Sequence, residues 1–214
     1  MKLAIIGHGG HSKVIREIID FYNIYEIIGF FDDQYQQLVF KNGMYYGSVE
    51  SVSKVFESNP TSKLVIAIGS NQIRKNIAGK LKLPVERYAT LIHPAAVVSP
   101  SAEMKHGTVV MANAVINADS RIGSHSIINT GAIVEHDCQV GDFVHVSSGS
   151  VLTGGVVLED GVFIGAGTSV IPKVHIGLWS VIGAGATVIE NLPANCTAVG
   201  TPAKVKEKQI HGGA

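Results

Sequence analysis

The sequence predicts two parts of different architecture: a small α/β domain over residues 1–92, followed over residues 93–214 by a parallel β-helix with a C-terminal tail, the last eight residues of which lie outside the described structure. Two observations carry this prediction. In the first part, apolar stretches of strand length alternate with stretches of helical spacing, which is typical of a parallel sheet covered by helices. In the second part, every sixth residue from Val98 to Val188 is aliphatic, and neither a helix of period 3.6 nor a strand of period 2 produces that spacing.

The first part resembles half of a doubly wound, Rossmann-like fold. We expect, in order, a strand over Lys2–Ile6, a glycine-rich loop over Gly7–Ser12, a helix from Val14 to Tyr22, a strand over Ile27–Phe31, a helix over Val49–Phe56, a strand over Leu64–Ile68 and a helix over Gln72–Leu81. With about 92 residues, this half domain has room for a mononucleotide-sized ligand rather than for a whole dinucleotide.

The ends of these strands carry the residue types that bind a nucleotide. The loop Gly7–Ser12 opens a helix, so its backbone N–H groups can bind a phosphate. It departs from G-x-G-x-x-G at Ser12, and a tight turn without a ligand remains the alternative. Asp32 and Asp33 follow about 22 residues later, where a carboxylate can accept from a ribose hydroxyl or a base N–H. The candidate nucleotide-binding residues on this rim are Gly9, Gly10, His11, Asp32, Asp33 and Gly69.

The six-residue repeat indicates a prism of triangular section, with one short strand and one turn per repeat. Four residues after each aliphatic residue stands a small one, from Ala102 to Ala186, which can pack beside the aliphatic side chain on a narrow axis. Three repeats make a coil of 18 residues, so residues 98–193 supply about five coils. A β-sandwich, the alternative, would show turns every 8–12 residues. Because the repeats run without an insertion, no loop of the prism can build a ligand pocket, so such a pocket must come largely from the N-terminal domain and adjacent subunits.

Composition excludes several classes of function. Lys plus Arg is 17 and Asp plus Glu is 17, so the chain lacks the basic surface of a nucleic-acid binder. Mean hydropathy is +0.27, yet no stretch approaches the roughly 18 uninterrupted apolar residues of a membrane span. The apolar run at the start is too short for a signal-peptide core, and two cysteines make no disulfide framework. We therefore expect a cytoplasmic protein with no membrane insertion.

Several motifs together resemble one enzyme family. They are a G-x-G-G-H-x-K loop, a strand ending in Asp-Asp, I-A-I-G followed by N-x-I-R-K, E-H-D-C within the repeats and a terminal G-T-P-A-K. The combination is similar to the bacterial nucleotide-sugar N-acetyltransferases that act on UDP-4-amino sugars, to their sialic acid O-acetyltransferase relatives, and especially to acetyltransferases of exopolysaccharide operons. The resemblance implies a left-handed β-helix, a homotrimer with active sites between subunits, and acetyl-CoA bound between neighbouring prisms. It also implies a UDP-linked sugar as the acceptor, a product of the UDP-N,N'-diacetylbacillosamine type, and no metal.

His136 is the strongest candidate for a general base among the nine histidines. It lies at a turn of the repeat beside Asp137, whose carboxylate can fix the imidazole tautomer and stabilise the imidazolium. A surface histidine beside a solvated aspartate is the alternative. Cys138 occupies the small interior position of its repeat, so we expect a protonated thiol and direct attack of the acceptor on the thioester.

The resemblance assigns the remaining site residues. Asn129 matches an asparagine that contacts the base from the neighbouring subunit, and His145 matches a residue that contacts acetyl-CoA. Gly154, Ala166 and Ala184 match small residues along the pantetheine arm, and Lys204 could meet a phosphate of CoA. By this resemblance, Gly9, Gly10 and His11 would bind the diphosphate and Asp32 and Asp33 the uridine, while Gly69 would form part of the same rim.

Four other functions remain as alternatives. A γ-type carbonic anhydrase shares the prism but needs three zinc-binding histidines with a close pair, whereas His125, His136 and His145 are 11 and 9 residues apart. A non-catalytic solenoid would not need His136 and Asp137 together with a glycine-loop domain. A sialic acid O-acetyltransferase could use the same base on a hydroxyl. A dinucleotide-dependent reductase would need a larger sheet than the first domain offers.

Overall fold

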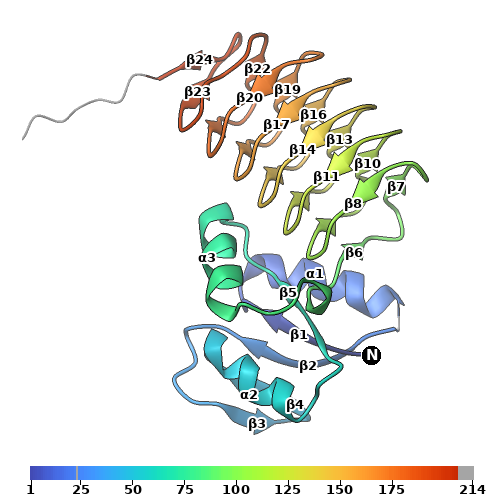
Figure 1. The fold of residues 1–214 in the computed structure, drawn as a ribbon, viewed down its shortest axis with the longest axis vertical. Coiled ribbons are helices and arrows are strands. Elements are labelled where there is room, and N and C mark those ends of the chain that lie inside the picture. The colour runs from blue at the N-terminus through green and yellow to red at the C-terminus, as the bar shows by residue number, and fades with distance from the viewer. Residues whose placement is uncertain (23, 207–214) are drawn as a thin grey trace, which may run out of the picture.

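The computed structural model describes residues 1–22 and 24–206, and it contains the two predicted architectures (Figure 1). The N-terminal sheet has the order β3-β4-β2-β1-β5. All neighbours in it are parallel except β3 and β4, which pair in antiparallel fashion. Its strands are β1 (Lys2–Ile6), β2 (Glu26–Phe31), β3 (Val39–Lys41), β4 (Met44–Gly47) and β5 (Lys63–Ile66).

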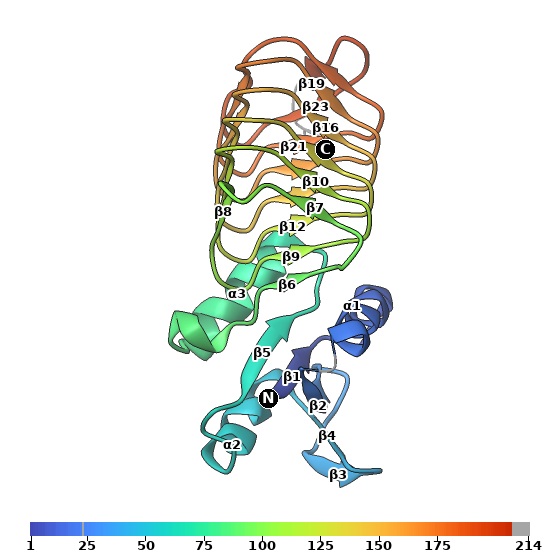
Figure 2. The same ribbon diagram turned by 90° about the vertical axis from the view of Figure 1, so that its right-hand side faces the viewer.

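Helices cover both faces of this sheet (Figure 2). They are α1 (Gly10–Tyr22), α2 (Val52–Glu57) and α3 (Asn71–Leu81), with short 3-10 turns η1 (Val49–Ser51) and η2 (Val85–Arg87). Because side chains alternate along a strand, Leu3 and Ile5 pack against α1, while Ala4 and Ile6 pack on the opposite side with α2 and α3. Within the described residues, the structure contains no helix with the length and apolar character needed to cross a membrane.

The prediction missed the hairpin formed by β3 and β4. Its turn is Asn42-Gly43, and both residues have positive φ (51° and 78°), which a two-residue hairpin turn of the primed type requires. Asn-Gly between apolar residues is a strong sequence signal for such a turn, so this element could have been predicted.

The second part is a triangular prism with three sheets, whose strands are parallel except for β24. Face 1 holds β6 (Leu91–Ile92), β9 (Val109–Val110), β12 (Ile127–Ile128), β15 (His145–Val146), β18 (Phe163–Ile164), β21 (Val181–Ile182), β23 (Thr197–Val199) and the antiparallel β24 (Lys204–Val205). Face 2 holds β7 (Val97–Val98), β10 (Val115–Ile116), β13 (Ile133–Val134), β16 (Val151–Leu152), β19 (Ser169–Val170) and β22 (Thr187–Val188). Face 3 holds β8 (Glu103–Met104), β11 (Arg121–Ile122), β14 (Gln139–Val140), β17 (Val157–Leu158) and β20 (His175–Ile176).

The repeat predicted the interior of the prism correctly. Strands pair with partners 18 residues away, as Ile116 does with Val134, and the aliphatic residues on the axis are buried. The turn residue three positions after each aliphatic residue, from Gly107 to Gly185, has positive φ, and half of these turn residues are not glycine. The prism begins with Ile92, one repeat before Val98, so the expected division between residues 92 and 93 falls at the end of its first strand.

The three edges of the prism are named by the faces that they join. Edge 1–2 contains residues 129–132, edge 2–3 residues 135–138 and edge 3–1 residues 141–144, with the equivalent residues 18 positions away in neighbouring coils. The N-terminal domain lies at the β6 end of the prism (Figure 1). Its α1-side core continues into face 1 through Leu91, Val109 and Met111, so the two parts share buried apolar surface.

Candidate active site

His136 and Asp137 lie together on edge 2–3, directly after β13. The Nδ1–H of His136 donates to Oδ2 of Asp137 at 2.8 Å, which leaves Nε2 with a free lone pair. Both side chains are exposed, at 63% and 66%. The hydrogen bond to Asp137 raises the pKa of His136. The pair is therefore a solvent-accessible base with a fixed tautomer, as a proton acceptor in catalysis requires.

Gly154 lies one coil beyond His136 and leaves room for its imidazole. A Cβ atom built at Gly154 would be 2.7 Å from both Cε1 and Nε2 of His136. The ring thus lies directly on the glycine backbone. The resemblance assigns Gly154 to the pantetheine arm, and the structure adds a close contact with His136 that the sequence analysis did not predict.

Cys138 lies inside the prism next to this pair. Its thiol is buried and donates to the carbonyl of Thr153 at 3.3 Å. Burial raises the thiol pKa, so the sulfur is protonated at neutral pH and is not a competing nucleophile.

His145 and Asn129 form a second cluster, on face 1 and edge 1–2. His145 is 8% exposed, and its Nδ1–H donates to the carbonyl of Gly69 at 3.2 Å. The Nδ2 amide group of Asn129 donates to Nε2 of His145 at 3.1 Å. Burial, and then the charge of Arg74, lowers the pKa of His145 to about 4, so the ring is neutral. The cluster joins a prism strand to the rim of the N-terminal sheet.

Arg74 on α3 is the main residue that the sequence analysis did not single out. It is 1% exposed, yet all its contacts are to neutral oxygens. Nε donates to the carbonyl of His125 at 2.9 Å, and Nη2 donates to those of Phe143 at 3.0 Å and Val144 at 3.2 Å. Burial lowers its pKa to about 9, so it keeps its charge at neutral pH.

Two neighbours of Arg74 extend this contact along edge 3–1. The side chain of Asn71 donates to the carbonyls of Gly161 and Val162, both at 3.1 Å, and Nζ of Lys75 lies 4.7 Å from the ring centre of Trp179. The motif N-x-I-R-K, which served only as a family signature, is therefore the contact that docks α3 on the prism.

The candidate nucleotide-binding residues lie after the carboxyl ends of β1, β2 and β5, and Asp32 has a structural role there. Its Oδ2 accepts from the backbone N–H of His8 at 2.8 Å and its Oδ1 from that of Gln34 at 3.0 Å, so it ties the first loop to the end of β2. Asp33 is exposed, and its Oδ1 accepts from the N–H of Val49 at 3.4 Å. An exposed His8 ring, stacked on Phe30 at 4.4 Å, also lines this rim and was not predicted.

The glycine loop has both open space and an unsatisfied group. No atom lies within 4 Å of a Cβ built at Gly9 or Gly10. Nε2 of His11 is buried, with no hydrogen-bond partner in the described part of the chain. Burial, followed by the charge of Arg74, lowers the pKa of His11 to about 4. His11 is thus a neutral imidazole beneath the loop.

The predicted residues fall into separate groups within one chain. Edge 2–3 carries His136, Asp137 and Gly154, whereas edge 1–2 carries Asn129, Ala166 and Ala184. The alanines are exposed, and Lys204 is engaged in an exposed ion pair with Glu190 at 2.9 Å. No hydrogen bond between residues that the structure describes joins His136 to Asn129 or His145.

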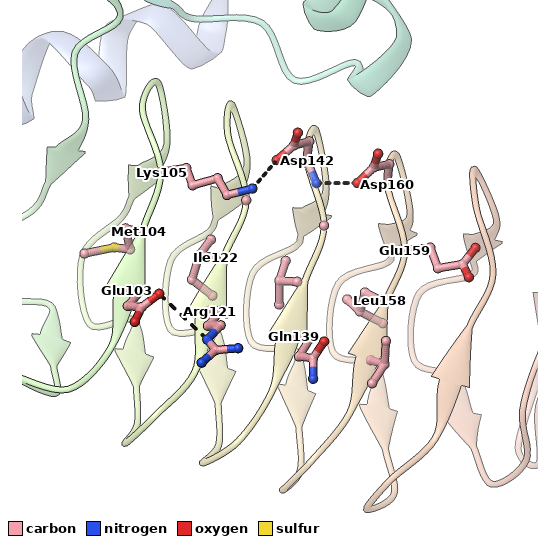
Figure 3. Close-up of a pocket in the computed structure, with 14 residues that line it drawn as sticks. Glu103, Met104, Lys105, Arg121, Ile122, Gln139, Asp142, Leu158, Glu159 and Asp160 are labelled. Carbon is pink, nitrogen blue, oxygen red and sulfur yellow. Dashed lines mark hydrogen bonds and ion pairs between the residues drawn. The ribbon is translucent and has the colours of Figure 1, made fainter. Parts of the chain in front are cut away.

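A cavity of about 590 Å³ lies elsewhere, on the outer surface of face 3 (Figure 3). Four of its charged side chains form two pairs: Lys105 points to Asp142 at 3.9 Å, and Arg121 to Glu103 at 3.7 Å. None of the predicted site residues lines it. Across residues 1–22 and 24–206, no group of three or more His, Cys, Asp or Glu is arranged to hold a metal ion.

Comparison with known proteins identifies the family. Residues 2–81 match the family described as the PglD N-terminal domain, and residues 119–154 match the bacterial transferase hexapeptide family with six repeats. The structure superposes with a TM-score of 0.87 on a histidine-to-asparagine variant of perosamine N-acetyltransferase from Caulobacter crescentus, in complex with CoA and GDP-perosamine. The two are 37% identical, and the match covers 97% of each chain. The chain belongs to the nucleotide-sugar N-acetyltransferases with hexapeptide repeats.

Other members of this sugar N-acetyltransferase family agree with the assignment. The acetyltransferase domain of PglB from Neisseria gonorrhoeae, in complex with acetyl coenzyme A, is 36% identical with a TM-score of 0.83, over 96% of this chain and 98% of that one. UDP-N-acetylbacillosamine N-acetyltransferase from Bacillus subtilis is 44% identical over 107 residues, which span half of this chain and half of that protein. The predicted fold and the predicted enzyme family are thereby confirmed.

Proposed function

We propose that the protein transfers an acetyl group from acetyl-CoA to the 4-amino group of a nucleotide-linked sugar, with His136 as the general base. One observation carries the proposal: the exposed His136 donates Nδ1–H to Asp137 and keeps Nε2 free. The acceptor that we favour is a UDP-linked 4-amino sugar, because the Bacillus relative is a UDP-N-acetylbacillosamine N-acetyltransferase. A GDP-linked sugar is the second choice, since the Caulobacter relative was crystallised with GDP-perosamine.

The proposed reaction needs no covalent enzyme intermediate. The neutral amine attacks the thioester carbonyl carbon, and Nε2 of His136 takes the proton that the nitrogen loses as the new C–N bond forms. The carboxylate of Asp137 stabilises the imidazolium through the existing 2.8 Å hydrogen bond. When the C–S bond breaks, the imidazolium returns this proton to the CoA sulfur. A hydroxyl acceptor could use the same base, so a sialic acid or related sugar O-acetyltransferase is the alternative.

We further propose a homotrimer, because one chain carries the two halves of this site on different edges. The base lies on edge 2–3, whereas Asn129, with His145 and the nucleotide rim beyond it, lies on the other side of face 2. Face 2 presents apolar side chains between those edges: Val97 is 62% exposed, and Val115, Ile133 and Val151 are half-buried. Packing of this face against a second prism would bury the apolar stripe and bring His136 toward a neighbour's Asn129.

Co-expression of two inactive chains tests this arrangement. In trimers of His136→Ala and Asn129→Ala chains, about one interface in four combines an intact base with an intact asparagine under random mixing. We therefore expect about a quarter of the wild-type activity from the mixture and almost none from either variant alone. An inactive mixture of correctly assembled trimers would place the whole site within one chain.

We infer a cytoplasmic place of action, because acetyl-CoA and nucleotide sugars are made there, and a role in the synthesis of exopolysaccharide or another surface glycan. The decisive experiment is a CoA-release assay with acetyl-CoA and three acceptors: a UDP-2-acetamido-4-amino-trideoxy sugar, GDP-perosamine and sialic acid. Turnover of an amino sugar that His136→Ala loses would support the proposal. Turnover of sialic acid alone would support the O-acetyltransferase. No turnover and no CoA binding would refute both.

A further inference from the structure

A continuous set of hydrogen bonds leads from Arg74 to the half-buried amide of Asn129. The carbonyl of Gly69 accepts from Nη1 of Arg74 at 2.9 Å and from Nδ1 of His145 at 3.2 Å. Because Nδ1 carries the proton of this neutral ring, Nε2 is an acceptor and receives the Nδ2–H of Asn129 at 3.1 Å. Each group thus determines the orientation of the next.

Asn129, the last residue in this set of hydrogen bonds, is held in one orientation. Oδ1 of Asn129 accepts from the backbone N–H of Thr130 at 2.8 Å, so the amide cannot flip without losing bonds on both sides. Its second Nδ2–H has no acceptor among residues 1–22 and 24–206. This N–H therefore remains available at the surface of edge 1–2, where the proposed function places a neighbouring subunit's base and the acetyl group.

We propose that Arg74 is a positioning residue for acetyl transfer, which holds the Gly69 carbonyl so that His145 and Asn129 keep the orientation that the reaction needs. The inference rests on the proposed function. It links the rim of the nucleotide domain to the acetyl-transfer edge through three side chains and one carbonyl. Displacement of Gly69 would release Nδ1 of His145, and the constraint on Asn129 would be lost with it.

Only arginine can make this set of contacts. Its planar guanidinium donates to the loop that follows β5, to the side chain of Asn71 on α3, and to carbonyls from two successive coils of the prism. A lysine ammonium offers three donors at one point and cannot reach these segments together. No carboxylate pairs with Arg74 in the described residues, and a buried charge without one is unfavourable for stability. The presence of a buried arginine at position 74 is thus better explained by the backbone segments that its hydrogen bonds hold together than by an ion pair.

The test compares Arg74→Met and Arg74→Lys with the control Lys75→Met. Lys75 lies on the same helix and docks on the same edge, through Trp179, but does not touch Gly69. Unfolding followed by the fluorescence of the single tryptophan, Trp179, measures how much each variant weakens the fold. Kinetics are then measured well below each unfolding transition, with kcat and KM determined separately for acetyl-CoA and for the sugar nucleotide.

We expect Arg74→Met to lower kcat by about 10²-fold, the effect of a displacement near 1 Å at the reacting groups, with Arg74→Lys intermediate. Lys75→Met should keep kcat within about twofold. Nitrogen NMR of His145 gives a readout that does not require turnover: a single Nδ1–H tautomer in the wild type, and a mixture or an imidazolium at higher pH in Arg74→Met.

Two results would overturn the inference. One is an equal loss of kcat in Arg74→Met and Lys75→Met once stability is matched, and the other is an unchanged tautomer of His145 in Arg74→Met. If the wild type turned over none of the acceptors, the proposed function would fail, and the NMR measurement would still decide whether Arg74 controls His145.

Discussion

Replacement of Gly154 by alanine tests the placement of the proposed base without a large effect on the fold. The new Cβ would lie 2.7 Å from Cε1 and Nε2 of His136, whereas ordinary van der Waals contact begins at 3.4 Å. The imidazole must therefore retreat by about 0.7 Å. The ring is the free end of an exposed side chain and Gly154 does not have positive φ, so little stability should be lost.

The expected effect on catalysis is much larger. A displacement of this size at a reacting group costs about 10²-fold in kcat, or about 2.7 kcal/mol of transition-state stabilisation. If the ring also leaves Asp137, the pKa of His136 falls toward its usual value, because that hydrogen bond is the main cause of the raised pKa. The acidic limb of the pH profile of kcat would then move to lower pH, since the base must be unprotonated to act.

The assay is CoA release at saturating acetyl-CoA and sugar nucleotide, together with thermal unfolding of the same preparations. Gly155→Ala is the matched control: Gly155 has φ of 71°, so alanine there should destabilise the fold by about 1 kcal/mol while kcat is retained. A Gly154→Ala enzyme with kcat within twofold of the wild type would refute the view that His136 works from the position seen in the structure.

Three further predictions concern the charge and packing of the molecule. Asp137→Asn should lower kcat at least tenfold and shift its acidic limb to lower pH, and an unchanged pH profile would exclude Asp137 as the partner of the base. Because the buried His11, His125 and His145 have folded pKa values of about 4, the unfolded chain binds more protons below its usual histidine pKa of about 6.5. The free energy of unfolding should therefore be highest above a pH of about 6.5 and should be lower by about 2 kcal/mol per histidine at pH 5. Equal free energies of urea unfolding at pH 7 and pH 5 would contradict this. Ile164→Ala should lower the unfolding free energy by about 2–5 kcal/mol, since its side chain is fully buried on the prism axis, and a loss below 1 kcal/mol would show that the coil can collapse onto the gap.

The periodic features of the chain could be predicted because each is determined locally. A short strand and a turn recur every six residues, so the sequence alone identifies which side chains point to the axis and places His136 at a turn. The pattern also stops where the structure changes: Ile182 pairs with Ala198, only 16 residues away, so the last coil is two residues shorter than the others. That shortening explains why the repeat could be followed to Val188 and not through the C-terminal strands.

The contacts of Arg74 could not be predicted in the same way. They join a helix to backbone carbonyls 51 and 69 residues further along the chain, and a carbonyl acceptor places no constraint on the residue type that carries it. His125 and Phe143 are therefore unremarkable in sequence, although both form the surface on which α3 docks. The motif N-x-I-R-K was visible, but only its partners reveal that it holds two domains together.

The triangular section also explains why candidate site residues that are close together in the sequence lie far apart within one folded chain. His136 and His145 are nine residues apart, which is half a coil, and this separation places the first on edge 2–3 and the second on face 1. Asn129, seven residues before His136, is on a third position, edge 1–2. A prism without inserted loops cannot fold these positions onto one another. Under the proposed function, His136 and the hydrogen-bonded set that ends at Asn129 would act on one acetyl group across a contact between two prisms, and the apolar stripe of face 2 lies between their edges.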